Sequence, residues 1–328
     1  MSVQSYKAFR RTTNGSSVEQ VEEKLLSSLH PNEVLIRIHA VSLNYRDVAM
    51  MNGKYPVKVI DRGIPASDCA AEVVAVESEV TDFKQGDHVA PIFDLNNLTG
   101  TEDETAVLGG DIDGVLRQFA VFNQKVLIHL PNHLSWEEAA CITCAGTTAW
   151  TALEMPRSNG TALLQAGIRP IITSSSDEKL EIARSLGGPG AVDTINYRTH
   201  PQWDEQARHL TGGRGVDVVV ENVGPTTMAQ SLRSLARRGT VSLVGFLGGF
   251  KTDQVPDTIG PVLVKSAVIR GIATGSKIDY QNLCNFLAAK KVSLKSLLDD
   301  ATFTFEESPA AFDHLYAAKH MGKVVIRM

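Results

Sequence analysis

Cysteine is scarce in this chain, with 4 residues among 328. So few cysteines cannot build a disulfide framework, so we expect a protein of a reducing compartment, the cytoplasm. Cys141 and Cys144 form a Cys-x-x-Cys pair, but it lies in an apolar stretch without a second pair. That setting favours a role in core packing over metal binding or redox chemistry.

An excess of charge of one sign is missing too. The net charge is −5 at pH 7 and the pI is about 6.0, without any long basic run. Nucleic acids and anionic membrane surfaces are therefore not expected partners. Residues 139–153 form the longest uncharged stretch, which at 15 residues is too short to span a bilayer. Residues 1–13 are polar, so we expect no secretory signal.

The first third of the chain has the pattern of β-structure. Residues 33–40 alternate apolar and polar side chains, which predicts a half-buried strand. Apolar runs at 71–76, 88–93 and 115–130 predict further strands. The character then changes at Ser135, which with Glu138 forms a capping-box pattern and predicts the start of a helix. Residues 139–153, apolar nearly all round, predict that this helix is buried.

Strands and helices alternate from about residue 161. The expected strands are residues 171–173, 216–221, 240–246 and 268–272. One expected helix buries Met228, Leu232 and Leu235 and ends in the basic turn 237–239. This alternation predicts a parallel sheet covered on both faces.

The last part of the chain leaves that pattern. Ser308 and Pro309 predict the start of a helix, and a strand is expected at residues 322–328. The side chains expected to point inward from the helix are Phe312, Leu315 and Tyr316.

Eight short segments carry a family resemblance. In chain order they are residues 41–47 (VSLNYRD), 86–91 (GDHVAP), 109–114 (GGDIDG), 145–150 (AGTTAW), 173–180 (TSSSDEKL), 213–217 (GRGVD), 245–246 (GF) and 322–326 (GKVVI). On these segments the chain resembles the medium-chain dehydrogenase/reductase superfamily, in the zinc-free, quinone-reductase-like branch that includes fungal zinc-type alcohol dehydrogenase-like proteins. The resemblance implies an α/β fold with two domains. A discontinuous GroES-like β-barrel catalytic domain would comprise residues 1–130 and 275–328, and a doubly wound parallel-sheet, Rossmann-like dinucleotide-binding domain residues 131–274.

The resemblance also identifies the positions where zinc enzymes of the superfamily hold their metal. The first cysteine ligand matches Asn44, the Gly-His-Glu segment matches Ser67 and Asp68, and Cys144 falls near the third ligand. One cysteine is not enough for a catalytic zinc site, which takes three protein ligands. The region 91–110, where a cysteine-rich structural lobe would lie, has no cysteine. We therefore expect no metal site.

Three residues are implied as catalytic by the resemblance: Asn44, Tyr45 and Asp47. In this branch they face the nicotinamide. Asn44 could donate an amide hydrogen bond to a substrate carbonyl, Tyr45 could donate or stack, and Asp47 would orient its neighbours. A second interpretation remains open, in which Asn44 and Asp47 only satisfy backbone amides in a strand-to-helix turn.

The expected cofactor is NADP(H), because the acidic residue that would bind the ribose 2′-hydroxyl is missing. Ser174, Ser175, Ser176 and Lys179 stand there instead, and hydroxyls with one ammonium at a helix start suit a 2′-phosphate. The other interpretation is an ordinary helix cap made by Ser175 and Glu178. Six further cofactor contacts are implied by the resemblance, with Tyr197 near the adenosine phosphate: Thr147, Tyr197, Asn222, Phe246, Gly275 and Ser276.

The glycine-rich fingerprint of a dinucleotide site, Gly-x-Gly-x-x-Gly, does not occur in the sequence. Residues 161–165 and 170–174 resemble the first two strands, and only the four residues 166–169 separate them. Neighbouring parallel strands need a crossover of roughly a dozen residues. The turn and first crossover helix are thus predicted to be missing, which truncates the domain near residues 165–170.

Three explanations of this gap stay open. In the first, a gene model has lost a fragment, and NADP(H) remains the cofactor. In the second, the protein has abandoned the dinucleotide and has no cofactor. In the third, the remaining contacts still bind the dinucleotide weakly.

The sequence thus predicts a zinc-independent NADP(H)-dependent oxidoreductase that acts on an enone, quinone or carbonyl small molecule. By resemblance to fungal relatives, its expected setting is secondary metabolism, and a homodimer is expected. The alternatives are a cofactor-independent isomerase, lyase or cyclase on the same scaffold, and a non-catalytic binding or subunit protein. The missing turn distinguishes the first function from the other two.

Overall fold

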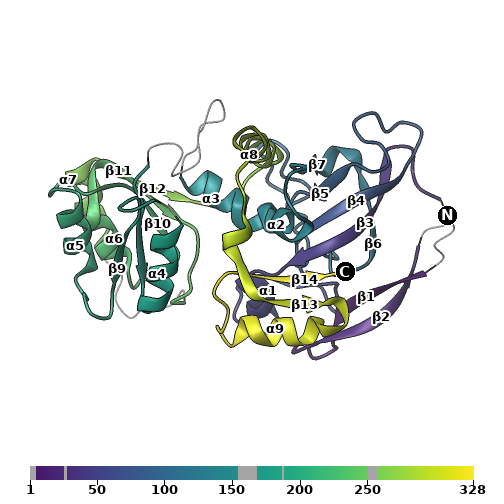
Figure 1. The fold of residues 1–328 in the computed structure, drawn as a ribbon, viewed down its shortest axis with the longest axis horizontal. Coiled ribbons are helices and arrows are strands. Elements are labelled where there is room, and N and C mark those ends of the chain that lie inside the picture. Colours follow the sequence, from purple (N-terminus) through teal and green to yellow (C-terminus); the bar gives the residue numbers. More distant parts are fainter. Residues whose placement is uncertain (1–4, 26–27, 154–167, 187, 250–256) are drawn as a thin grey trace. The chain divides into compact units, whose positions relative to one another are not determined.

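The computed structural model describes residues 5–25, 28–153, 168–186, 188–249 and 257–328. The chain divides into two compact units, residues 1–147 with 275–328, and residues 148–274. Each unit contains both helices and strands (Figure 1). Within the described ranges, no helix has both the length and the apolar character needed to cross a membrane.

The first unit is built on a sheet that joins the two ends of the chain. Its strand order is β13-β14-β3-β4-β5-β7, with β6 also paired to β3. These strands are β3 (Glu33–Ser42), β4 (Asp68–Val76), β5 (His88–Pro91), β6 (Phe119–Asn123), β7 (Leu127–His129), β13 (Leu298–Thr304) and β14 (Lys323–Arg327). The antiparallel pairing of β14 with β3 sets Val325 opposite Ser42. A hairpin of β1 (Ser5–Arg11) and β2 (Val18–Lys24) forms a separate sheet.

The predicted alternation in β3 is confirmed. Val34, Ile36 and Ile38 are at most 2% exposed, whereas Arg37, on the opposite face, is exposed. The apolar stretch 115–130 is not continuous, because the 3₁₀ turn η1 (Gln124–Val126) separates β6 from β7. The side chain of Asn123 accepts the Lys125 N–H at 3.0 Å and so starts that turn.

Short helices cover the sheet of the first unit. They are α1 (Tyr45–Met51), α2 (Trp136–Ala140), α8 (Lys277–Lys290), α9 (Ser308–Tyr316) and the 3₁₀ turns η3 (Lys295–Leu297) and η4 (Phe305–Glu307). Helix α9 buries Phe312 and Leu315 as predicted, but Tyr316 is 45% exposed, so its inward placement was wrong. The Tyr316 hydroxyl accepts a hydrogen bond from Lys54 Nζ at 2.9 Å on the surface instead.

The apolar stretch 139–153 is helical and largely buried, but it is not the single helix that was predicted. Helix α2 is followed by the π-helical turn η2 (Ile142–Gly146) and then by α3 (Thr147–Ala152). The predicted capping box is present, with Ser135 Oγ accepting the Glu138 N–H at 3.2 Å. The break has an identifiable cause, which comes from a distant part of the sequence. A carboxylate oxygen of Asp68 accepts the Cys144 N–H at 3.0 Å, so the Asp68 side chain is inserted into the helical hydrogen-bond ladder.

Residues 131–147 belong to the first unit, although the sequence analysis grouped them with the dinucleotide-binding domain. The carboxylate of Glu138 accepts hydrogen bonds from Ser293 Oγ and Leu294 N, both at 2.7 Å. Arg327 Nε donates to Glu137 at 2.6 Å. Helix α2 is therefore held by residues close to the C-terminus, a connection that local sequence does not reveal.

The second unit contains parallel strands only, among its described residues. Strand β8 (Ile171–Ser174) pairs with β9 (Asp193–Asn196), and a second sheet has the order β10-β11-β12. Its strands are β10 (Val216–Glu221), β11 (Leu235–Leu243) and β12 (Val268–Gly271), and the helices are α4 (Asp177–Ser185), α5 (Trp203–Leu210), α6 (Met228–Ser234) and α7 (Ile259–Lys265). The predicted strand 161–165 lies outside the described residues, as do residues 166 and 167 of the predicted gap beside it.

The predicted end of the helix at residues 237–239 was wrong. Helix α6 ends at Ser234, and residues 237–239 belong to β11. Leu235 pairs with Val216 and Thr240 with Val218, so the residues between them form a bulge. A Cβ on Gly239 would lie 3.0 Å from the Asp217 carbonyl oxygen, so this glycine permits a close approach of two strands rather than stopping a helix.

The carbonyl groups at the end of α6 are capped from another helix. Lys265 Nζ, at the end of α7, donates to the carbonyl oxygens of Leu232 at 2.8 Å and of Arg233 and Leu235 at 2.6 Å. A lysine at this position satisfies orphan carbonyls and offsets the negative end of the helix dipole.

We predict that Lys265→Met lowers the free energy of unfolding by about 1–3 kcal/mol, because hydrogen bonds from a charged donor are lost at partly buried carbonyls. Urea denaturation measures this loss. Arg237→Gln is the matched control: Arg237 is exposed, so its change should stay within about 0.5 kcal/mol. Equal losses in the two variants would contradict the capping role of Lys265.

Two imidazole rings flank the indole of Trp136 at the start of α2. The His39 ring stacks on it with centroids 4.3 Å apart, and the His88 ring lies at 4.1 Å. His39 Nε2 also lies 3.2 Å from a carboxylate oxygen of Glu72. Burial lowers the pKa of His39 below its usual value and outweighs the opposing hydrogen bond to Glu72.

This lowered pKa predicts how stability depends on pH. Below the unfolded-state pKa of about 6.5, the unfolded chain binds a proton that the folded His39 binds less readily. The free energy of unfolding therefore falls as the pH drops below about 6.5 towards the folded-state pKa. Urea denaturation between about pH 5 and 8 should show a smaller fall for His39→Gln than for the unchanged chain, and no such difference for the exposed His30→Gln. Identical pH profiles for all three proteins would contradict this assignment.

Candidate active site

The turn between β3 and α1 carries the three residues that were predicted as catalytic. Asn44 is the N-cap of α1, with an extended backbone, and its N–H donates to Asp47 Oδ2 at 2.8 Å. The Leu43 N–H donates to the Val324 carbonyl at 2.9 Å, which ties the turn to β14. Tyr45 is the first residue of α1 and is 43% exposed. The backbone interactions expected for a strand-to-helix turn are therefore present.

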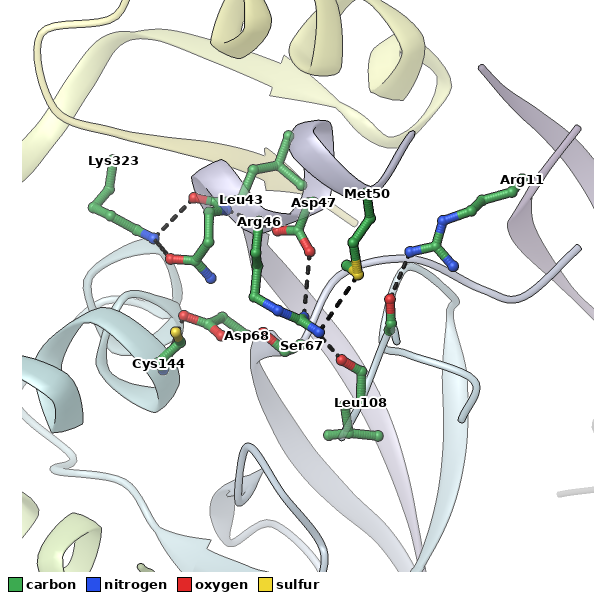
Figure 2. Close-up of polar contacts among 12 residues, drawn as sticks. Arg11, Leu43, Arg46, Asp47, Met50, Ser67, Asp68, Leu108, Cys144 and Lys323 are labelled. Atoms are coloured by element: carbon green, nitrogen blue, oxygen red, sulfur yellow. Dashed lines mark hydrogen bonds and ion pairs between the residues drawn. The ribbon is translucent and has the colours of Figure 1, made fainter. Parts of the chain in front are cut away.

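A lysine from the other end of the chain holds the side chain of Asn44. Lys323 Nζ donates to the Leu43 carbonyl oxygen at 2.8 Å, a contact marked in Figure 2, and to Asn44 Oδ1 at 2.5 Å. The other end of the same amide, Nδ2, is buried and has no hydrogen-bond partner among the described residues. A buried amide donor without a partner is costly in a folded protein and calls for an explanation, of which a bound ligand is one.

Asp47 is fully buried beneath this turn and faces a buried guanidinium. Arg46 Nη1 lies 3.6 Å from Asp47 Oδ1 and donates to the Leu108 carbonyl oxygen at 3.0 Å (Figure 2). The guanidinium also lies over the Phe93 ring, 4.9 Å from its centroid. Burial raises the pKa of Asp47, while Arg46 and the Asn44 N–H oppose that rise. The carboxylate thus anchors the backbone of Asn44.

The residues that match zinc ligands lie in the same region, but the oxygen atoms of Asp68 and Asn44 accept hydrogen bonds from groups within the protein. Asp68 is fully buried and accepts hydrogen bonds from the Cys144 N–H at 3.0 Å and from Ser67 Oγ at 2.7 Å. Burial raises the pKa of the Cys144 thiol to about 12. Asn44 Oδ1 already accepts from an ammonium. In the part of the chain that the structure describes, no three His, Cys, Asp or Glu residues are grouped to hold a metal ion.

One group of predicted cofactor residues lies together in the second unit, at the carboxyl ends of β8 and β9. Ser174 Oγ accepts the Ser176 N–H at 3.2 Å, and the Tyr197 N–H donates to the Ser174 carbonyl at 3.1 Å. Ser175 lies between the two serines, and Lys179 is in the first turn of α4.

The cap of α4 is Ser176, whose Oγ accepts the Lys179 N–H at 3.3 Å, so the predicted cap by Ser175 was wrong. The hydrogen bond to Ser174 holds residues 174–176 in a turn and starts the helix one residue later.

A second group follows β10 and β11. Asn222 comes directly after β10, and Phe246 follows three residues after the end of β11. The Asn222 carbonyl accepts the Leu247 N–H at 2.9 Å. A Cβ on Gly245 would lie 3.0 Å from that carbonyl oxygen, so the glycine permits the close approach. Ligands of doubly wound sheets bind at such strand ends.

The loop that carries Asn222 is organised by a residue that the sequence analysis missed. The carboxylate of Glu221 is buried and accepts from Val223 N at 2.8 Å, Gly224 N at 3.0 Å and Thr227 Oγ1 at 2.8 Å, and also from Ser231 Oγ. Its position at the end of an apolar strand was the available signal.

The remaining predicted cofactor residues, Thr147, Gly275 and Ser276, belong to the first unit. Thr147 Oγ1 donates to the Ile142 carbonyl at 3.3 Å. Ser276 caps α8 and donates from Oγ to Asp279 Oδ2 at 2.7 Å. The described contacts of these two hydroxyls are therefore helix-capping or intrahelical ones.

Lys323 and Arg46 were also missed as site residues. Both lie in segments that carry the family resemblance, but strand periodicity assigned Lys323 only to a strand. It meets Asn44 across 279 residues of sequence, which only the paired strands explain.

Comparisons with known proteins agree with this architecture. Residues 30–132 match the alcohol dehydrogenase GroES-like domain, and residues 158–289 match the zinc-binding dehydrogenase family. A zinc-type alcohol dehydrogenase-like protein of Schizosaccharomyces pombe is 35% identical over 94% of both chains. A quinone oxidoreductase of Pseudomonas aeruginosa is 32% identical over 67% of this chain and 66% of its own. The crystal structure of a putative alcohol dehydrogenase from Sinorhizobium meliloti covers 100% of both chains, with 31% identity and a TM-score of 0.85.

The chain belongs to the medium-chain dehydrogenase/reductase superfamily. The superfamily identified from the eight short segments is thereby confirmed, as is the α/β fold with a GroES-like and a Rossmann-like part, whereas the zinc-free branch stays a prediction. The relatives support an oxidoreductase of the dehydrogenase or reductase type.

Proposed function

We propose that this medium-chain dehydrogenase/reductase is zinc-independent, uses NADP(H), and acts on an enone, a quinone or another carbonyl compound. The observation that carries the proposal is the buried amide of Asn44, whose Oδ1 is bound by Lys323 and whose Nδ2 has no partner among the described residues. Such a donor is suited to a carbonyl oxygen. Secondary metabolism and the cytoplasm remain the proposed setting.

The chemistry of carbonyl or enone reduction explains why that donor matters. Negative charge develops on the substrate oxygen as hydride arrives, and a preorganised donor stabilises it most when water is excluded. Asn44 Nδ2 would donate to this oxygen, with the Lys323 ammonium supplying positive charge behind it. Tyr45, at 43% exposure, would donate or stack at the edge of the site, and Asp47 would hold the Asn44 backbone. The nicotinamide, when bound, supplies the hydride.

The residues present do not fit zinc. A catalytic zinc site takes three protein ligands, and Cys144 is the only thiol or imidazole at the positions that match zinc ligands. Asp68 uses its oxygens on the Cys144 N–H and Ser67 Oγ. The Lys323 ammonium at Asn44 Oδ1 would repel a second cation at this position.

The residues of the second unit fit the adenosine end of NADP(H). Ser174, Ser175, Ser176 and Lys179 place hydroxyls and one ammonium at the start of α4, where the helix dipole favours a phosphate. The carboxylate of Asp177 accepts a hydrogen bond from Asn196 Nδ2 at 2.7 Å. Tyr197 is proposed to lie beside the adenosine phosphate. The other proposed contacts, towards the nicotinamide, are Thr147, Asn222, Phe246, Gly275 and Ser276.

The gap predicted at residues 166–169 favours a second candidate function. Without the glycine turn, the pyrophosphate would lose its backbone donors, while the Asn44 site in the first unit would remain complete. A cofactor-independent isomerase, lyase or cyclase could then use Asn44, Tyr45 and Asp47 on the same scaffold.

A homodimer also remains a proposal. Helix α7 exposes Ile259 at 73%, Leu263 at 73% and Val264 at 76%, and exposed apolar patches often mark contacts between subunits. Sedimentation of the purified chain would test it.

We predict that the purified chain contains no stoichiometric zinc, because the positions that match zinc ligands offer one cysteine, an asparagine bound by an ammonium, and a carboxylate that is already hydrogen-bonded. Elemental analysis of protein purified without chelators measures this. About one zinc per chain, removable together with activity by a chelator, would contradict the proposal.

We predict that this chain, whose sequence has no Gly-x-Gly-x-x-Gly turn, does not bind NADPH at micromolar concentration, so that use of NADP(H) depends on restoring the turn. Each charge-assisted hydrogen bond missing from the pyrophosphate site costs about 1.5–3 kcal/mol, or roughly tenfold to a hundredfold in affinity. Titration calorimetry measures the affinity. Micromolar binding would show that residues 174–179 and the strand ends at Asn222 and Phe246 are enough.

Inserting a Gly-x-Gly-x-x-Gly turn and a crossover helix between Gln165 and Pro170 separates the two candidate functions. The extended chain should bind NADPH and reduce an enone, quinone or carbonyl, and Lys179→Ala should weaken NADPH more than NADH. Tight NADPH binding without turnover of any such compound would contradict the oxidoreductase proposal. Isomerase or lyase activity of the chain without the inserted turn would favour the second function.

A further inference from the structure

We propose that Lys323 is a positioning residue, which fixes the orientation of the Asn44 amide so that Nδ2 points at the carbonyl oxygen of the substrate. The inference rests on the proposed function, because it names the residue that prepares the donor used there. Lys323 itself need not touch the substrate.

Strand pairing brings the two side chains together. Strand β14 pairs antiparallel with the end of β3, with Ile326 opposite Val41 and Val325 opposite Ser42. The Leu43 N–H donates to the Val324 carbonyl at 2.9 Å and continues this ladder by one step. Lys323, the first residue of β14, is thereby placed beside Asn44, the cap of α1.

The hydrogen-bond donors and acceptors of Lys323 and Asn44 determine the orientation of the Asn44 amide. An ammonium group only donates, so the atom 2.5 Å from Lys323 Nζ must be the oxygen of the Asn44 amide. The opposite orientation would set an NH₂ group against an NH₃⁺ group. With Oδ1 turned to Lys323, Nδ2 necessarily occupies the other side, where it is buried and unpartnered among the described residues.

The surrounding contacts leave this amide few alternatives. Lys323 Nζ is itself fixed by the Leu43 carbonyl oxygen at 2.8 Å. The backbone of Asn44 is fixed by Asp47 Oδ2 at 2.8 Å, and Asp47 is held next to Arg46. Once the backbone is fixed, rotation of the amide remains the main freedom of the side chain, and Lys323 removes it. A charged donor on Oδ1 also polarises the amide and strengthens its N–H as a donor.

The test uses the full chain without cofactor, labelled with ¹⁵N at asparagine. The probe is cyclohexanone, a carbonyl compound that does not alkylate thiols, and the Asn44→Asp spectrum assigns the Asn44 side-chain signals. In the unchanged chain we expect cyclohexanone to shift the Asn44 NH₂ signals. In Lys323→Met we expect these signals to move before any probe is added, and the probe affinity to fall at least tenfold. Lys323→Arg, which keeps a cationic donor, should restore most of both.

Lys277→Met is the matched control, because Lys277 Nζ donates to the Lys125 carbonyl at 2.6 Å and is not in contact with Asn44 through any described bond. It should leave both readouts unchanged. If Lys323→Met does not fold, Lys323→Gln replaces it, since a glutamine amide can donate or accept and no longer selects one orientation of Asn44.

The outcomes separate this inference from the proposed function. Unaltered Asn44 signals in Lys323→Met or Lys323→Gln would overturn the positioning role, whether or not cyclohexanone binds. Altered signals together with no probe binding in any protein would support the positioning role and count against the carbonyl site. Altered signals with unchanged probe affinity would overturn the link between orientation and carbonyl binding.

Discussion

The antiparallel pairing of β14 with β3 is the constraint on which the first unit depends. It closes a sheet from the two ends of the chain and places Val325 opposite Ser42. The same pairing delivers Lys323 to Asn44 and brings Arg327 to Glu137 on α2. The proposed carbonyl site is therefore a consequence of chain closure: a loss of this pairing would remove the sheet edge, the anchor of α2 and the amide orientation together.

Asp68 is the second point at which fold and chemistry meet. Its buried carboxylate accepts the Cys144 N–H, and this interrupts the helical ladder between α2 and α3. The interaction also occupies an oxygen at a position that the resemblance matches to a zinc ligand. The cationic group beside Asn44 is instead the Lys323 ammonium. The Lys323 ammonium can orient a neutral amide donor without any deprotonated thiol. Burial raises the pKa of the Cys144 thiol and so disfavours its thiolate.

Sequence reasoning succeeded where local pattern determines structure and failed where distant contacts do. The alternation in β3 and the capping box at Ser135 follow from residues within a few positions, and both are present. Gly239 was misassigned because a helix stop and a close strand approach use the same residue, and only the Asp217 carbonyl in the neighbouring strand distinguishes them. The turn residues Asn44 and Asp47 could be selected from the family segments. Lys323 also lies in a family segment, but its role could not be inferred there, since it depends on a partner 279 residues away.

The strand order of the second unit gives the predicted gap a meaning beyond the cofactor. In the usual doubly wound order 3-2-1-4-5-6, the first strand lies between the second and the fourth, which here correspond to β8 and β10. The described strands form two separate sheets, β8-β9 and β10-β11-β12, which are the two flanks of that order. Ile172 in β8 is 41% exposed and Val220 in β10 is 39% exposed, although continuous apolar strands of this kind are normally covered. A chain segment that cannot form a parallel crossover next to β8 would therefore affect the centre of the sheet as well as the pyrophosphate site, so cofactor affinity and stability of this unit are expected to change together.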